Sequence, residues 1–123
     1  NLPGADLRAR QLRLSIQRWI SGEADADYHE TFAEFLHRVG EGIERVRDHR
    51  SAVVATSGGA IAATAACLLL PGARPSDVGP MWLRLNWVLT NASITRVRAT
   101  DSALQLVSFN EHGHLVGNLR THV

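Results

Sequence analysis

Cysteine is nearly absent from this sequence. The single Cys67 cannot form an internal disulfide, which fits a reducing compartment and leads us to expect a cytoplasmic protein. Cys67 lies inside an apolar helical pattern, so we interpret it as a small core residue rather than as a reactive thiol.

Long apolar runs and an excess of charge are absent as well. The longest apolar run, residues 60–70, is shorter than the roughly 20 residues that span a bilayer, so no membrane segment is predicted. The formal net charge of +1 excludes binding to nucleic acid through bulk charge, and a small anion would need a local site. An initial methionine is also lacking, and we expect the chain to be a piece of a longer protein.

The composition itself is that of a globular domain. Of the 123 residues, 45% are hydrophobic and 20% are charged. A chain of this length can bury roughly two-thirds of its unfolded surface. It contains no internal repeat and no linker, so residues 1–123 are predicted to form a single domain.

Apolar spacing predicts two helices in the first half of the chain. Residues 7–20 follow a loose helical pattern that is rich in arginine. Residues 32–46 carry one apolar stripe with a period of 3.6 residues, which is typical of an amphipathic helix. Thr31 and Glu34 have the spacing of a capping box at the start of that helix.

The middle of the chain changes from an extended to a helical pattern. Residues 52–56 are continuously apolar, which predicts a strand buried on both faces of a parallel sheet. Residues 59–70 predict a deeply buried helix that ends at Pro71. We expect a loop from Pro75 and a short helix over residues 81–85.

A β-hairpin is predicted near the end of the chain. Residues 93–98 and 103–109 are extended patterns that flank a turn-forming Thr-Asp-Ser cluster. Helices, a buried strand and a hairpin together predict a layered α/β fold, with too few strands for a complete sheet.

The turn Ser57-Gly58-Gly59 stands between the predicted strand and the buried helix. The free N–H groups and the positive dipole end of a helix start favour an anion such as phosphate. The glycines would let the backbone approach that ligand, and Ser57 would add a hydroxyl group. Alternatively, the glycines only relieve steric strain in a plain turn.

Four segments, taken in order, carry a combined signal. They are Glu30-Thr31-Phe32-Ala33-Glu34-Phe35-Leu36-His37-Arg38-Val39, residues 53–61, Asn91-Ala92-Ser93-Ile94-Thr95 and Phe109-Asn110-Glu111-His112-Gly113-His114-Leu115. Together they resemble the C-terminal part of the histidine phosphatase superfamily, the phosphoglycerate-mutase-like fold. The resemblance implies a layered α/β/α architecture that is incomplete at the N-terminus.

The resemblance also implies an activity. Members of the family hydrolyse or transfer phosphoryl groups of small phosphate esters through a phosphohistidine. Glu30 would be the proton donor, with a simple helix-dipole carboxylate as the alternative. Ser57 would act in catalysis and, with Gly58 and Gly59, contact the phosphate. Asn91 is placed among the substrate-binding residues, with the bracing of a strand end as the alternative.

Two departures from the family pattern affect the expected activity. No Arg-His-Gly occurs, so the nucleophilic histidine and its strand are expected upstream of Asn1, and this chain alone is expected to be inactive. Ser57 stands where the family has its second histidine, and serine brings no positive charge. Because the family places its first strand beside residues 53–56, we also expect an exposed sheet edge there.

Two other functions stay open. Ser57, followed by Asp101 and then His112 or His114, has the chain order of a serine hydrolase triad. A non-catalytic member of the fold could instead bind a phosphorylated ligand. No metal ligand set surrounds the histidines, and no cofactor is expected. The expected partner is a small phosphorylated substrate or phosphate, and a homo-oligomer stays open.

Overall fold

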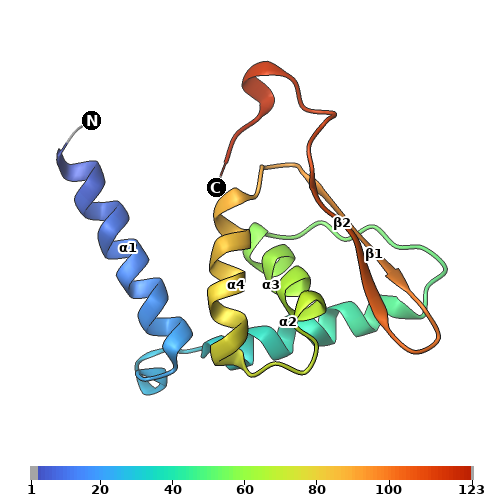
Figure 1. Cartoon of the computed structure of the whole chain (residues 1–123), viewed down its shortest axis with the longest axis horizontal. Helices are drawn as coiled ribbons and strands as arrows, with labels where there is room; N and C mark the ends of the chain where they lie inside the picture. The colour runs from blue at the N-terminus through green and yellow to red at the C-terminus, as the bar shows by residue number, and fades with distance from the viewer. Residues whose placement is uncertain (1–2, 123) are drawn as a thin grey trace.

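The computed structural model describes residues 3–122. In this part of the chain, four helices are followed by one two-stranded antiparallel sheet (Figure 1). The elements are α1 (Pro3–Ser21), α2 (Phe32–Arg47), α3 (Gly58–Leu69), α4 (Pro75–Val88), β1 (Ile94–Ala99) and β2 (Leu104–Glu111), with short 3-10 turns at Asp25–Asp27 and Gly117–Leu119. This mixed α/β architecture confirms the predicted fold class.

The start of α2 confirms the predicted capping box. The Thr31 hydroxyl accepts a hydrogen bond from the Glu34 N–H at 3.1 Å, and the Glu34 carboxylate accepts one from the Thr31 N–H at 2.8 Å. The apolar stripe that follows faces inward, with Phe32 and Phe35 buried.

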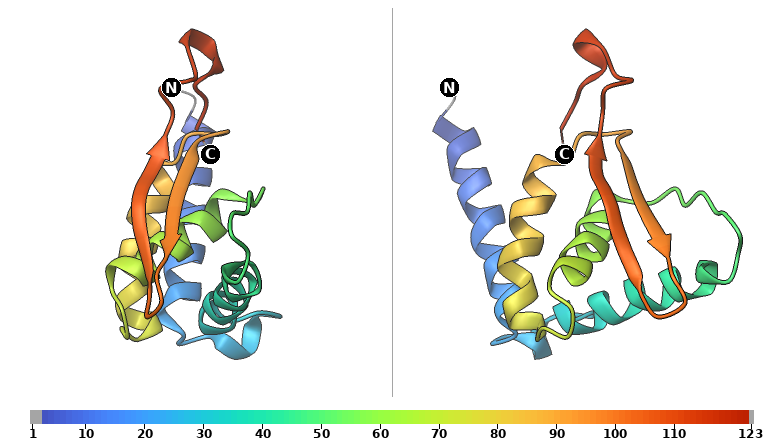
Figure 2. Two further views of the ribbon diagram at one scale, coloured as in Figure 1. Left: turned by 90° about the vertical axis from the view of Figure 1, so that its right-hand side faces the viewer. Right: turned by 45° about the vertical axis from the view of Figure 1, so that its right-hand side comes forward.

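Helix α3 occupies the centre of the molecule, between α4 and the hairpin (Figure 2). Ala62, Ala63, Ala65 and Ala66 are fully buried, because such small side chains let neighbouring elements approach the helix closely. The prediction of a deeply buried helix is therefore confirmed. The chain leaves α3 through Gly72, whose φ of 74° suits glycine.

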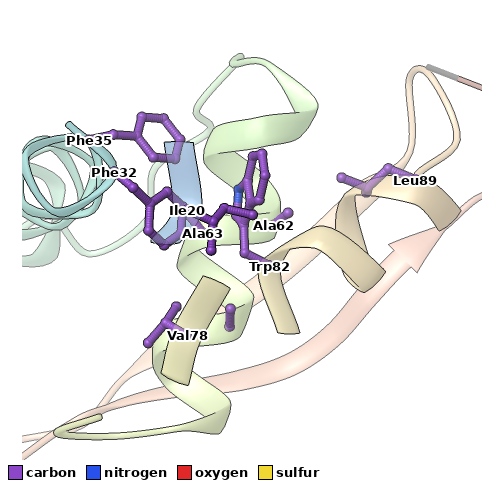
Figure 3. Packing of buried hydrophobic residues seen from close by; sticks show 9 residues of the cluster. Ile20, Phe32, Phe35, Ala62, Ala63, Val78, Trp82 and Leu89 are labelled. Carbon is purple, nitrogen blue, oxygen red and sulfur yellow. The ribbon is translucent and has the colours of Figure 1, made fainter. Parts of the chain in front are cut away.

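An aromatic cluster joins α1, α2 and α4. Its members are Trp19, Phe32, Phe35 and Trp82, and Figure 3 shows the last three beside the alanines of α3. Trp19 packs edge-on against Phe32 with ring centroids 5.1 Å apart, and the Trp19 and Trp82 centroids lie 5.8 Å apart. Edge-to-face pairs of this kind stabilise a fold beyond the area that they bury.

The hairpin is confirmed as well. β1 and β2 pair in antiparallel register, with Val97 opposite Leu106 and Ala99 opposite Leu104. The connecting turn is closed by the Thr100 N–H, which donates to the Ala103 carbonyl at 2.8 Å.

The predicted buried strand at residues 52–56 is wrong. This segment is neither helix nor strand in the described part of the chain, and Val53 is 100% exposed. β-branched residues favour extended backbone, but a buried strand also needs neighbours, and β1 pairs only with β2 among residues 3–122. The segment is therefore not the sheet edge that was expected, because it lies outside the sheet and is exposed.

Helix α4 begins earlier than predicted. Pro75 occupies its first turn instead of opening a loop, because the missing proline N–H is not needed there. The helix then runs through Pro80 to Val88, so the short helix predicted over residues 81–85 lies within it. Buried Val78 and Trp82 hold it against the core.

Helix α1 packs only near its C-terminal end. Ile20 is buried, whereas Leu7, Leu12 and Leu14 are exposed, and the N-terminal end stands away from α4 in Figures 1 and 2. Between residues 3 and 122, no helix combines the length and the apolar character that crossing a membrane requires.

Candidate functional site

Ser57 is the residue that precedes the first turn of α3. It has an extended conformation, with φ −79° and ψ 157°, and its carbonyl accepts the helix hydrogen bond from the Ile61 N–H at 3.2 Å. Its exposed side chain does not cap the helix. The first N–H groups of a helix lack intrahelical partners, so this end presents free donors beside a free hydroxyl group.

The two glycines of the turn are not required by backbone conformation. Neither Gly58 nor Gly59 has a positive φ. A Cβ atom at Gly59 would meet Trp82 and Phe35 at 3.8 and 3.9 Å, which is ordinary van der Waals contact. At Gly59, neither the backbone conformation nor the neighbouring side chains require glycine.

Glu30 lies just before the capping residue of α2 and forms a bidentate ion pair with Arg38. Arg38 Nε donates to Glu30 Oε1 at 2.6 Å, and Nη2 donates to Oε2 at 3.0 Å. The hydrogen bonds from Arg38 lower the pKa of Glu30, and the same pair raises the pKa of Arg38. Arg38 and Glu30 thus form a partly exposed ion pair at the start of α2.

The aromatic cluster positions Glu30 and the α3 turn. Trp19 Nε1 donates to the main-chain carbonyl of Glu30 at 2.8 Å, and Trp82 Nε1 donates to that of Gly59 at 2.9 Å. Because the two tryptophan rings contact each other, both predicted site segments are fixed to one rigid framework. Within residues 3–122, no hydrogen bond joins Glu30 directly to Ser57.

Asn91 lies in a tight turn after α4. Its side-chain amide donates to the Thr121 hydroxyl at 3.0 Å, and its N–H donates to the Thr121 carbonyl at 2.8 Å. The next residue, Ala92, has a φ of 60°, an uncommon value outside glycine. These contacts match the bracing role that the sequence left open, and they do not connect Asn91 with Glu30 or with the α3 turn.

The sequence did not predict a groove of about 770 Å³ that lies between α2, α3, the hairpin and the segment 52–56. Its lining includes Thr56 and Ala60, which flank the α3 turn, and the arginines Arg38, Arg47, Arg50 and Arg98. No carboxylate is part of the described lining, so the groove is favourable for an anion. Because α2, α3 and the hairpin form the groove together, no single segment of the sequence indicates it.

The candidate residues of a serine hydrolase are not joined to Ser57. Asp101 lies in the hairpin turn. His112 Nδ1 contacts the Asn110 carbonyl at 2.6 Å, and His114 Nε2 contacts the Ala92 carbonyl at 2.9 Å.

No group of three metal-ligating side chains comes together in the described part of the chain. Burial raises the pKa of the Cys67 thiol, as expected for a partly packed residue.

Comparison with known proteins places this chain in a family. The model of the histidine phosphatase superfamily (branch 1) matches residues 5–112, which include Glu30, the α3 turn and Asn91. The chain therefore belongs to the histidine phosphatase superfamily. No curated protein and no solved structure gave a match.

Proposed function

We propose that this protein takes part in phosphoryl transfer from small phosphate esters, as a phosphoglycerate-mutase-like phosphatase or mutase. The observation that carries the proposal is the α3 turn. The Ser57 hydroxyl does not cap its helix, and two glycines occur where the backbone conformation does not require them. Such a turn suits close approach of a phosphate to backbone N–H groups.

Glu30 is proposed as the proton donor to the leaving oxygen. Trp19 and the capping box fix its backbone, so the carboxyl group has a defined position at the start of α2. The nucleophilic histidine is proposed to come from an Arg-His-Gly segment outside these 123 residues, because the sequence contains none. Positive charge around the transferred group stabilises the transition state, and Ser57 adds only a hydrogen bond there.

Phosphate binding by a non-catalytic member of the fold is the second candidate. Two observations favour it: Ser57 replaces a residue expected to carry charge, and Arg38 keeps the Glu30 carboxylate paired. The hydrogen bonds of residues 3–122 give the serine hydrolase no comparable support.

Hydrolysis of p-nitrophenyl phosphate tests the leading proposal. A polypeptide that extends this chain upstream through Arg-His-Gly is expected to release p-nitrophenol, and the variant with alanine at that histidine is expected to be inactive. Equal rates of p-nitrophenol release in both polypeptides would contradict the proposed phosphatase activity. Phosphate binding without turnover would then support the second candidate. A fluorophosphonate probe that labels Ser57 stoichiometrically would support the hydrolase instead.

A further inference from the structure

Trp82 carries a buried indole N–H group that has a single acceptor. Its side chain extends from α4 toward α3 (Figure 3), and the residue is only 5% exposed. Within residues 3–122, Trp82 Nε1 donates one hydrogen bond, to the main-chain carbonyl of Gly59 at 2.9 Å. A buried donor that loses its acceptor destabilises a fold, so this bond persists as long as the ring stays in the core.

Three other aromatic rings fix the orientation of Trp82. The ring centroids of Trp19 and Phe32 lie 5.8 and 5.5 Å from that of Trp82, and both pairs are edge-on. The Phe35 centroid lies 6.2 Å away. A Cβ atom at Gly59 would be in ordinary contact with Trp82 and Phe35, so both rings pack beside this residue. Trp82 therefore cannot turn away from Gly59 without disturbing the close-packed aromatic cluster.

The Gly59 carbonyl belongs to the same planar peptide unit as the Ala60 N–H group. Ala60 is the third residue of α3, and its N–H makes no hydrogen bond within residues 3–122, because the first N–H groups of a helix lack intrahelical partners. A hydrogen bond accepted by the peptide oxygen draws electron density from the peptide nitrogen. The N–H group then becomes a stronger donor, by roughly 10–30% for each bond in such a chain.

Ala60 also faces the place where an anion would lie. It lines the groove beside the α3 turn together with Thr56. The described lining of that groove contains arginines and no carboxylate, so an anion near the Ala60 N–H meets no opposing charge there. A hydrogen bond from an N–H group to a phosphate oxygen is charge-assisted, which makes the strength of this donor important.

We propose that Trp82 is a positioning residue for phosphate, which acts through the peptide unit between Gly59 and Ala60. Its indole N–H fixes this peptide and polarises it, so the Ala60 N–H is a stronger donor than the same group in an ordinary first helical turn. The coupling is reciprocal, because an anion bound to the Ala60 N–H makes the Gly59 carbonyl a better acceptor for Trp82. The inference rests on the proposed function, which places the phosphate at this turn.

NMR titration of the full chain with inorganic phosphate tests the coupling. In the unmodified protein, phosphate is expected to shift the amide signals of Gly58, Gly59 and Ala60. The indole N–H signal of Trp82 should move downfield in the same titration, because its hydrogen bond strengthens. The indole signal of Trp87, which is 42% exposed, is the internal reference and should stay in place.

Trp82→Phe removes the donor and keeps an aromatic ring. Without phosphate, the signals of the Gly59 carbonyl carbon and the Ala60 amide nitrogen are expected to shift, because both nuclei respond to hydrogen bonding at this peptide. The affinity for phosphate should fall roughly twofold to fourfold, which is the polarisation expected for one charge-assisted hydrogen bond. If Trp82→Phe does not fold, the indole signals of the unmodified protein decide alone.

Two variants control the test. Trp87→Phe makes the same substitution on the same helix, at a residue whose indole forms no hydrogen bond within residues 3–122, and should change neither readout. Ile20→Val removes a buried methyl group from the core that contains Trp82. It should lower the melting temperature while the Gly59 and Ala60 signals and the affinity for phosphate stay unchanged.

Two results would overturn the inference. In the first, phosphate shifts the α3 amides, but either the Trp82 indole signal stays in place or Trp82→Phe keeps its affinity for phosphate. Trp82 is then a core residue only, and the proposed function stands. In the second, no concentration of phosphate shifts the α3 amides. The phosphate site itself is then wrong, and the inference fails with it.

Discussion

The indole N–H of Trp19 donates a hydrogen bond to the main-chain carbonyl of Glu30, with 2.8 Å between the two atoms. The last turn of α1 is thereby fixed to the segment that carries the candidate proton donor. The same ring packs edge-on against Phe32 at the start of α2. Although most of α1 is exposed, its C-terminal end is part of the framework of the site.

Trp19→Phe tests this connection. Phenylalanine keeps an aromatic ring but loses the N–H donor, so we expect the free energy of unfolding to fall by about 1 kcal/mol. Urea denaturation followed by circular dichroism measures the change. Trp87→Phe is the matched control, because Trp87 is 42% exposed, and it should change stability by less than about 0.5 kcal/mol. Equal effects of the two substitutions would contradict the role given to Trp19.

Gly79→Ala tests the contact between α1 and α4. A Cβ atom at Gly79 would lie 2.0 Å from Ile20 Cγ2 and 3.3 Å from Ile20 Cβ, so the Ile20 side chain or its helix must shift. We expect a loss of about 1–3 kcal/mol from overpacking, measured as a lower melting temperature. A Cβ atom at Gly42 in α2 would meet nothing within 4 Å. Gly42→Ala should therefore raise the free energy of unfolding by about 0.5–1 kcal/mol. The two glycine substitutions should therefore have opposite signs.

Asn110 connects the hairpin to the end of α4. Its side-chain oxygen accepts from the Thr90 N–H and its amide donates to the Val88 carbonyl, both at 2.8 Å, while its φ is 58°. Asn110→Ala should lower the free energy of unfolding by about 1–3 kcal/mol, because it removes both hydrogen bonds and because alanine rarely adopts a positive φ. Asn110→Gly should cost less, because glycine tolerates the conformation. If the alanine variant proves the more stable, backbone strain at this position is unimportant.

Acid should remove a stabilising contribution from Glu111. The Ser108 hydroxyl donates to its carboxylate at 2.5 Å and Arg96 at 2.8 Å, and these bonds lower the pKa of Glu111, with Ser108 the larger cause. A lowered pKa gives a contribution that is complete above the ordinary glutamate value of about 4.3 and is lost as pH falls through the folded value. Glu111→Gln should therefore flatten the decline of the melting temperature below about pH 4.3. If the melting temperature declined as steeply in the variant, Glu111 would not contribute to the loss of stability in acid.

Ser57→His tests the charge that serine lacks. A histidine beside the α3 turn would become cationic below its ordinary pKa of about 6.5. We expect the affinity for phosphate, measured by calorimetry, to increase as pH falls from roughly 7.5 to 6, because the histidine gains a proton in that range. Salt should weaken the affinity, because it screens the new charge. Ser57→Asn is the uncharged control and should show no such pH dependence.

The elements that the sequence predicted well depend on local signals. The capping box of Thr31 and Glu34 and the turn at Thr100 involve residues three positions apart, so their physics is contained in a short segment. The prediction of a buried strand at residues 52–56 was wrong because the burial of a strand depends on distant partners. Pro75 was misread because proline suits a loop and the first turn of a helix equally well.

The candidate site could be predicted only in part. The resemblance indicated Glu30 and the α3 turn, but not that Arg38 would bond the carboxylate. Glu30 lies outside α2, so helical spacing does not apply to this pair. The groove beside Arg38 is formed by α2, α3 and the hairpin together, and no single segment carries its signal.

The segment 52–56 has a consequence for the handling of the protein. Its backbone makes no main-chain hydrogen bond within residues 3–122, and its residues are exposed throughout. Such segments are where proteases cut first. A single cut would leave Trp19, Phe32 and Phe35 on one fragment and Trp82 on the other. The buried contacts between these rings should hold the two fragments together as a nicked but folded complex.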